Sequence, residues 1–264
     1  MAETVLEYLY PEISNLYGDP FNIKYLVKCL EVNNATAVLK EDSLNEAPYF
    51  KDGVPDLIYM GPMTEHSQEL AIERLLPYRE RIIELIKSDV VFLITGNALE
   101  IFGQGIECED GRFIKGLDIF PFTGKRKMFD RYNSLFLGEF EGIKVVGNKS
   151  QFSHGYKDSS VTCSEAGGAL SGNSENGRYL SADGFIKVIR GDGLCPGESY
   201  EGIRNHNFFA TYLLGPLLPL NPALTAYFLK LLKIDDPVTA FEKEAVKAYE
   251  IRLAEFENPK TELK

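Results

Sequence analysis

The chain has 264 residues, of which 44% are hydrophobic and 25% charged, a composition typical of globular proteins large enough for a sizeable core. Its net charge of −11 argues against nucleic acid and anionic membranes as partners. The sequence has neither an apolar run of the roughly 20 residues that a transmembrane helix needs nor a signal-peptide pattern at its N-terminus. We therefore expect no membrane insertion and a cytoplasmic location.

The first part of the chain predicts alternating strands and helices. Expected strands cover residues 5–10, 36–39, 56–60 and 90–95, and an expected helix covers 23–31. A second helical region begins after Thr64, which is a suitable cap, and Pro77 should split it. This order predicts an α/β fold, with a mostly parallel central sheet flanked by helices on both faces.

The pattern changes after residue 103. Residues 104–115 suggest a short hairpin or loop, and residues 155–182 a polar surface insertion. The other expected elements are strands at 116–122, 133–140, 143–146, 185–190 and 207–214, a helix at 222–232 and a charged C-terminal surface helix at 238–256. Without a repeat or a clear linker, residues 1–264 are interpreted as one domain.

Residues 90–103 predict a buried strand, a tight turn and the start of a helix. In α/β enzymes, a sharp turn of this kind raises one side chain above the sheet, and that side chain is often a nucleophile. Here the tip of the elbow is Gly96, between Thr95 and Asn97. Side chains alternate along a strand, so Thr95 should point into the sheet.

Several segments together resemble the glutamine amidotransferase subunit of lipid II isoglutaminyl synthase, in the cobyric-acid-synthase-like branch of class I glutamine amidotransferases. They occur in the order of that family and cover most of the chain outside residues 155–182 and the C-terminal tail. The matching segments are residues 15–19 with Asn22, 56–61 with Gln68, the elbow to Gly103, 116–118 with Thr123, 147–148, 201–203 with Asn207, and 211–216 with Leu218 and Pro219.

The resemblance implies a flavodoxin-like fold and a cytoplasmic bacterial protein of peptidoglycan synthesis. It also implies a chemistry in which an elbow Cys attacks glutamine, a late-strand His activates that Cys, and a glycine-rich loop holds the oxyanion. An Arg binds the glutamine, and the ammonia passes to a Mur-ligase-like synthetase partner.

This chain departs from that pattern at each of these positions. Gly96 stands at the nucleophile position and Leu214 at the His position. The oxyanion loop reads Gly61-Pro62-Met63, in which Pro62 has no N–H to donate. The position of the glutamine-binding Arg falls near Phe129, with Arg131 two residues away.

The leading hypothesis is a degenerate glutamine amidotransferase-like protein without glutaminase activity. It would act as a non-catalytic or regulatory subunit beside a Mur-ligase-like partner. The alternative is reassigned chemistry or small-molecule binding in the same cleft, at candidate binding residues Gly61, Pro62, Thr64, Asn97, Glu100 and Arg131. In a third interpretation, the chain is a family member in name only, and an active paralogue in the same organism carries out the glutaminase reaction.

The remaining candidates are weaker. Cys163 with His154 could form a replacement dyad, and His206 is another catalytic candidate, although a loop thiol and surface histidines are the simpler interpretation. The chain has four cysteines and three histidines, and their spacing matches no metal-site pattern, so we expect neither a metal nor a cofactor. The basic run at residues 125–127 could bind an anionic ligand or an acidic partner.

Overall fold

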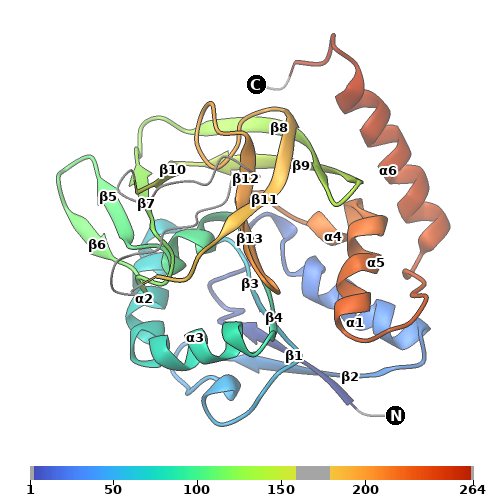
Figure 1. Cartoon of the computed structure of the whole chain (residues 1–264), viewed down its shortest axis with the longest axis horizontal. Helices are drawn as coiled ribbons and strands as arrows, with labels where there is room; N and C mark the ends of the chain where they lie inside the picture. Colours follow the sequence, from blue (N-terminus) through green and yellow to red (C-terminus); the bar gives the residue numbers. More distant parts are fainter. Residues whose placement is uncertain (1–2, 159–178, 263–264) are drawn as a thin grey trace.

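A computed structural model describes residues 3–158 and 179–262. Its main feature is a nine-stranded sheet in the order β2-β1-β3-β4-β13-β12-β11-β8-β9 (Figure 1). These strands are β1 (Glu3–Leu9), β2 (Thr36–Asp42), β3 (Leu57–Met60), β4 (Val91–Thr95), β8 (Tyr132–Phe140), β9 (Ile143–Gln151), β11 (Asp183–Arg190), β12 (Tyr200–Asn205) and β13 (Phe208–Thr211). The run from β2 to β13 is parallel, and the remaining pairs are antiparallel. The predicted α/β fold is confirmed.

Helices cover both faces of the parallel part of this sheet (Figure 1). Tyr59 and Leu93 belong to the core beneath α1 and α5, whereas Met60 and Ile94 belong to the core beneath α2 and α3. This alternation explains why the central strands read as continuous apolar runs, because both of their faces are buried. The α-helices are α1 (Phe21–Val32), α2 (Glu65–Leu75), α3 (Arg79–Lys87), α4 (Leu217–Leu220), α5 (Pro222–Leu231) and α6 (Glu242–Glu257).

Several local predictions for the helical segments are confirmed. Leu76–Tyr78, a 3₁₀ turn that contains Pro77, separates α2 from α3. The Thr64 hydroxyl caps α2 by accepting a hydrogen bond from the Ser67 N–H at 3.2 Å. None of the helices in the described ranges combines the length and apolar character needed to cross a bilayer.

A smaller sheet, ordered β10-β7-β5-β6, lies beside the elbow. Its strands are β5 (Gly105–Cys108), β6 (Phe113–Lys115), β7 (Phe122–Arg126) and β10 (Ser153–Lys157). β5 and β6 form the hairpin that the sequence suggested for residues 104–115. The strands expected at 133–140 and 143–146 are β8 and the first part of β9, which pair as a hairpin that turns at Glu141-Gly142.

The strand predicted at residues 116–122 is wrong. These residues instead form a connection whose backbone bonds to the elbow segment, for example from the Leu117 N–H to the Ile101 carbonyl at 2.8 Å. Leu117, Ile119 and Phe120 are fully buried there, which explains their strand-like apolar pattern. Strand β7 begins only at Phe122.

Other boundaries also differ from the predictions. Strand β12 was missed, and the strand expected at 207–214 ends at Thr211, so Leu214 lies in the following loop. The helix expected to start at the elbow is the 3₁₀ helix η4 (Gly96–Phe102). Of the proposed insertion, residues 155–157 belong to β10, and residues 159–178 lie outside the described residues.

Candidate functional site

The elbow lies at the C-terminal end of β4, where Gly96 has φ +61°. This is the left-handed region, in which a side chain is strained. A β-carbon on Gly96 would lie 2.4 Å from Pro62 Cβ and 3.2 Å from Leu214 Cδ2. Three of the positions that differ from the family pattern, Gly96, Pro62 and Leu214, are therefore in contact. Pro62 and Leu214 occupy the space that an elbow side chain would need.

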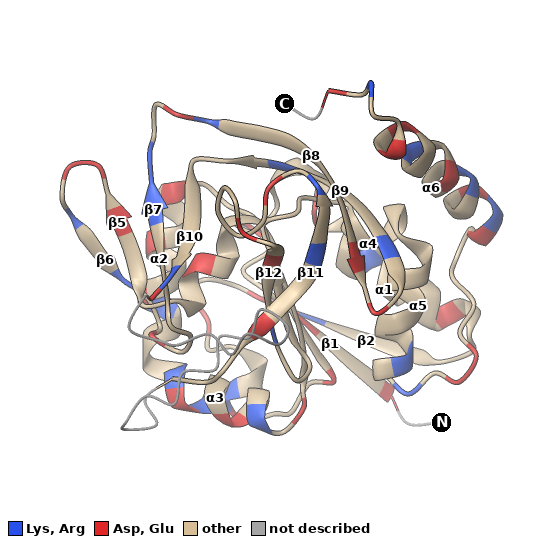
Figure 2. Ribbon diagram, turned by 45° about the horizontal axis from the view of Figure 1, so that its top comes forward, with Lys and Arg blue, Asp and Glu red and all other residues tan. Residues whose placement is uncertain are grey.

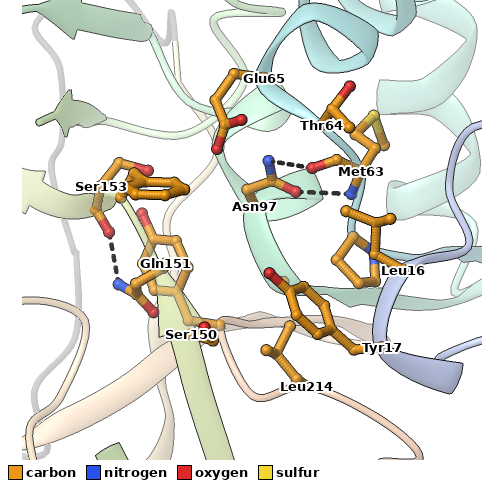
Figure 3. Close-up of a pocket in the computed structure, with 14 residues that line it drawn as sticks. Leu16, Tyr17, Met63, Thr64, Glu65, Asn97, Ser150, Gln151, Ser153 and Leu214 are labelled. Carbon is orange, nitrogen blue, oxygen red and sulfur yellow. Dashed lines mark hydrogen bonds between the residues drawn. The ribbon is translucent and has the colours of Figure 1, made fainter. Parts of the chain in front are cut away.

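The loop that carries Pro62 is fixed by Asn97. The Met63 N–H donates to Asn97 Oδ1 at 3.0 Å, and Asn97 Nδ2 donates to the Met63 carbonyl at 2.9 Å (Figure 3). Pro62 has no N–H, and the Met63 N–H is bonded to Asn97. Neither residue therefore offers the cavity a free backbone donor of the kind that stabilises an oxyanion.

A cavity of about 210 Å³ lies over the elbow (Figure 3). Its apolar side includes Leu16, Pro62 and Leu214. The complete lining is Leu16, Tyr17, Pro62, Met63, Thr64, Glu65, Gly96, Asn97, Ser150, Gln151, Phe152, Ser153, Tyr212 and Leu214. Of the predicted site residues, the structure brings Pro62, Thr64, Gly96, Asn97 and Leu214 together in this lining.

Arg131 is not among the residues that line this cavity, but it contacts three of them. Its Nη2 donates to the Tyr17 hydroxyl at 2.6 Å, and its Nε donates to Ser150 Oγ at 3.0 Å. The guanidinium also lies 5.2 Å from the centre of the Phe152 ring. Because all three contacts are lining residues, Arg131 connects the β9 side of the cavity, at Ser150, to the Tyr17 side.

Glu100 lies behind the cavity wall rather than in it. Its side chain is fully buried and accepts hydrogen bonds from Gln68 Nε2 and the Tyr212 hydroxyl, each at 2.9 Å, and from Ser153 Oγ. Burial raises the pKa of this carboxyl group. Glu100 therefore ties the elbow helix to α2, β10 and the segment after β13, all of which border the cavity.

Gly61 also lies outside the lining. A β-carbon there would come within 2.7 Å of the Ser14 carbonyl oxygen, so the residue allows the turn before α1 to pack against the loop after β3.

The turn before α1 also supplies Asp19, which is fully buried and accepts hydrogen bonds from the Thr95 and Tyr59 hydroxyls. Burial raises the pKa of Asp19 to about 6. Thr95 is thus directed away from the cavity, as expected.

The cavity also contains polar residues that the sequence did not identify: Ser150, Gln151 and Ser153. Gln151 is 6% exposed, and its Oε1 is buried without a hydrogen-bond partner among the described residues. These residues reach the cavity from β9 and β10, which belong to different sheets. No local motif marks them, although Gly147 and Asn148, which precede them, belong to a family-like segment.

None of the described cysteines or the three histidines is among the residues that line the cavity. His154 Nδ1 lies 3.3 Å from Gln151 Nε2, and its ring packs against Tyr132. His206 is exposed and near Asp89. Cys163, the other half of the suggested dyad, lies outside the described residues. Within the described ranges, no group of His, Cys, Asp and Glu is arranged to hold a metal.

Comparison with known proteins confirms the resemblance predicted from the sequence. The chain is 24% identical over 221 residues to "Lipid II isoglutaminyl synthase (glutamine-hydrolyzing) subunit GatD" of Streptococcus pneumoniae, covering 83% of this chain and 76% of that protein. It is also 24% identical over 230 residues to the subunit of the same name from Staphylococcus aureus, covering 87% and 84%. No family model matches the chain.

The fold is also found in a solved structure. A protein described as "Crystal structure of glutamine amidotransferase" matches with a TM-score of 0.50 and 11% identity, covering 86% of this chain and 99% of that one. At this identity the likeness concerns the fold alone. It agrees with the α/β architecture described above.

Proposed function

We propose that this chain is a glutamine amidotransferase-like subunit of a cell-wall amidating complex, and that it does not hydrolyse glutamine. The similarity to two proteins named as subunits of a glutamine-hydrolysing lipid II enzyme supports the complex and the pathway. In the proposed complex, the chain binds a Mur-ligase-like synthetase in a non-catalytic or regulatory role.

The observation that carries the proposal is the packing of Gly96 against Pro62 and Leu214. Covalent amide hydrolysis needs a nucleophile within reach of a general base. Gly96 has no side chain, and Leu214, whose Cδ2 would lie 3.2 Å from an elbow β-carbon, has no proton-accepting atom. Removal of the nucleophile and base of such a unit abolishes the covalent route.

The loop at Pro62 supports the same conclusion independently. Loss of one oxyanion donor costs about 3–4 kcal/mol of transition-state stabilisation in comparable enzymes. Here Pro62 cannot donate, and the neighbouring Met63 N–H is already bonded to Asn97. The arrangement would therefore be a poor amidase even if a thiol entered the cavity from elsewhere.

An electrophilic glutamine analogue, 6-diazo-5-oxo-norleucine, tests the loss of the nucleophile. We expect no covalent adduct in the intact mass of the full chain, because none of the described cysteines lines the cavity. A glutamine-hydrolysing relative treated in parallel is the positive control. A stoichiometric adduct mapped to any cysteine, including Cys163, would contradict the proposal.

Small-molecule binding in the cavity is the second candidate. The unpartnered Gln151 Oε1 favours it, because a buried acceptor without a partner is costly unless a ligand or water satisfies it. The apolar packing of Leu214 and Pro62 reduces the space at the elbow and disfavours reassigned catalysis there. A ligand whose addition shifts the Gln151 side-chain amide resonances would favour this second function.

A further inference from the structure

Two buried carboxyl groups meet where β1 and β2 run side by side. Glu7 is 0% exposed, and Asp42, the last residue of β2, is 7% exposed. In the parallel register of the two strands, Glu7 lies opposite Lys40 and Leu9 lies opposite Asp42, while β3 places Ile58 beside Glu7 on its other side. Side chains alternate along a strand, so Glu7 and Asp42 point to the same face of the sheet. Leu9 and Ile58 belong to the core beneath α2 and α3, which identifies that face.

Each of these carboxyl groups uses one oxygen to bind the segment between β2 and β3. The Phe50 N–H donates to Glu7 Oε1 at 2.8 Å, and the Tyr49 N–H donates to Asp42 Oδ1 at 3.2 Å. Phe50 is fully buried in the core on this face. The two hydrogen bonds therefore fasten the 3₁₀ turn η2 (Tyr49–Lys51) to β1 and β2.

The second oxygen of each carboxyl group has no donor. Glu7 Oε2 and Asp42 Oδ2 are both buried without a hydrogen-bond partner among the described residues. Two carboxylates cannot donate to each other, whereas a single proton held between them gives each of these oxygens a partner. Burial, and next the adjacent Asp42 carboxyl group, raise the pKa of Glu7 to about 9. Geometry and electrostatics therefore both favour one bound proton at neutral pH.

Basic side chains near this segment have other partners. Arg81 of α3 donates to the Phe50 and Gly53 carbonyls at 3.0 and 2.8 Å, and Lys40 lies 5.6 Å from the centre of the Tyr49 ring. Figure 2 shows acidic and basic residues mixed along α3, so this helix presents no surface of one sign. The other ionisable groups on the elements around the pair are Tyr10, Glu12, Lys40, Tyr49, Arg74, Tyr78 and Arg81. Isolated side chains of these types titrate outside the range of about pH 6–8, so a proton bound in that range is assigned to the carboxyl pair.

We propose that Glu7 and Asp42 share one proton and form a pH-sensitive clamp on η2. The proton joins the two inner oxygens, and the two outer oxygens hold the Tyr49 and Phe50 N–H groups. When rising pH removes the proton, two buried negative charges lie side by side, and their repulsion favours opening of the segment. This inference does not depend on the proposed function.

The clamp should make stability fall as pH rises. Between the ordinary Glu pKa of 4.5 and the raised pKa of Glu7, the folded chain holds a proton that the unfolded chain has released. The stabilisation is complete below the ordinary value and is lost as pH rises through the folded value. Within this window, each pH unit should raise the unfolding equilibrium constant by up to about tenfold through this group.

Urea denaturation of the full chain at about pH 6 and about pH 8 tests the clamp. Glu7→Gln places an amide N–H where the proton would be and keeps an oxygen for the Phe50 N–H. We expect the rise in the unfolding constant between the two pH values to be smaller in this variant by at least about 30-fold. Glu41→Gln is the matched control, because Glu41 is exposed on β2 beside Asp42, and it should keep the wild-type rise.

A local measurement separates the clamp from a general effect on folding. In the wild type, the protection of the Tyr49 and Phe50 amides against hydrogen exchange should fall over the same pH range, after correction for the intrinsic exchange rate. In Glu7→Gln it should change much less. Constant protection of both amides in the wild type would overturn the clamp.

The carboxyl carbon-13 resonance of Glu7 in the wild type tests the proton without any variant. It should titrate above about pH 8, and titration near about pH 4.5 would overturn the inference. Equal pH dependence of unfolding in the wild type and Glu7→Gln would overturn it too. So would stabilisation of the wild type, but not of Glu7→Gln, by sodium, potassium or calcium chloride at constant ionic strength, because a cation would then join the two oxygens.

Discussion

Replacement of Gly96 by Ala is expected to lower the free energy of unfolding by about 2–5 kcal/mol, a large loss for a single added methyl group. Two effects add. The residue has φ +61°, and the new β-carbon would lie 2.4 Å from Pro62 Cβ. Urea denaturation of the purified variant measures the loss.

Two further variants separate strain from crowding. Gly142→Ala is the matched control, because Gly142 has φ +80° and a β-carbon added there would meet nothing within 4 Å, so only backbone strain of about 1–2 kcal/mol is expected. The pair Gly96→Ala with Pro62→Gly should be more stable than the sum of the single changes by at least about 1 kcal/mol. Equal losses for Gly96→Ala and Gly142→Ala would show that Pro62 does not fill the elbow.

Replacement of Lys149 by Met is expected to cost about 3–5 kcal/mol of stability. The Lys149 ammonium pairs with Glu201, and the two side chains are 1% and 0% exposed. It also donates to the Asp192 and Gly193 carbonyls, at 2.8 and 2.6 Å. Its removal leaves the Glu201 carboxylate buried without its counter-charge and two carbonyls without their donor.

The same measurement on two other variants tests this explanation. Lys149→Met combined with Glu201→Gln should recover part of the loss, since no buried charge then remains unpaired. Lys144→Met is the surface control on the same strand. Lys144 pairs with Glu257, their side chains are 44% and 42% exposed, and its loss should cost less than about 1 kcal/mol. A comparable loss for Lys144→Met and Lys149→Met would refute the role of burial.

The Lys149–Glu201 pair also bears on the site. Glu201 Oε1 accepts hydrogen bonds from the Thr211 hydroxyl at 2.9 Å and from the Tyr212 N–H at 2.6 Å. These bonds fix the end of β13, just before Leu214 enters the cavity lining. The buried ion pair therefore supports the segment whose Leu214 side chain lies against the elbow.

Local signals were sufficient to predict the parallel half of the sheet. Strands β3 and β4 are buried on both faces, so their residues are apolar without interruption, and Pro77 and Thr64 mark helix limits by simple chemistry. Strand β12 escaped prediction because its sequence, Tyr-Glu-Gly-Ile-Arg-Asn, is mostly polar. Glu201 is acceptable in its interior only because Lys149, distant in sequence, neutralises it.

The sequence likewise placed only part of the candidate site, namely the residues that follow parallel strands. Gly96, Pro62 and Leu214 could be brought together because each follows a parallel strand, and such strands end at one edge of the sheet. Ser150, Gln151 and Ser153 could not, because their position depends on how the second sheet packs beside the first. Glu100 could not be placed either, since only its buried partners Gln68 and Tyr212 distinguish it from a surface carboxylate.

The cavity lies over the elbow at the C-terminal end of β4, and Pro62 and Leu214 close that elbow with apolar contacts. The hydrogen bonds of Asn97 to Met63 hold the loop after β3, and the hydrogen bond of Glu100 to Gln68 holds α2. A cavity whose elbow has neither a nucleophile nor a base is better suited to binding than to turnover. The proposed role rests on this difference: the hydrogen bonds around the cavity are present, whereas Pro62 and Leu214 fill the position of the elbow side chain.

Ammonia release from L-glutamine, measured with the full chain alone and in the presence of the Mur-ligase-like synthetase, tests the central claim most directly. We predict a rate no greater than that of the synthetase or buffer alone. For Gly96→Cys with Leu214→His we predict a rate well below that of a glutamine-hydrolysing relative, because Pro62 still crowds the elbow and offers no oxyanion donor. Glutamine-dependent ammonia release by the wild-type chain, above these controls, would contradict the account.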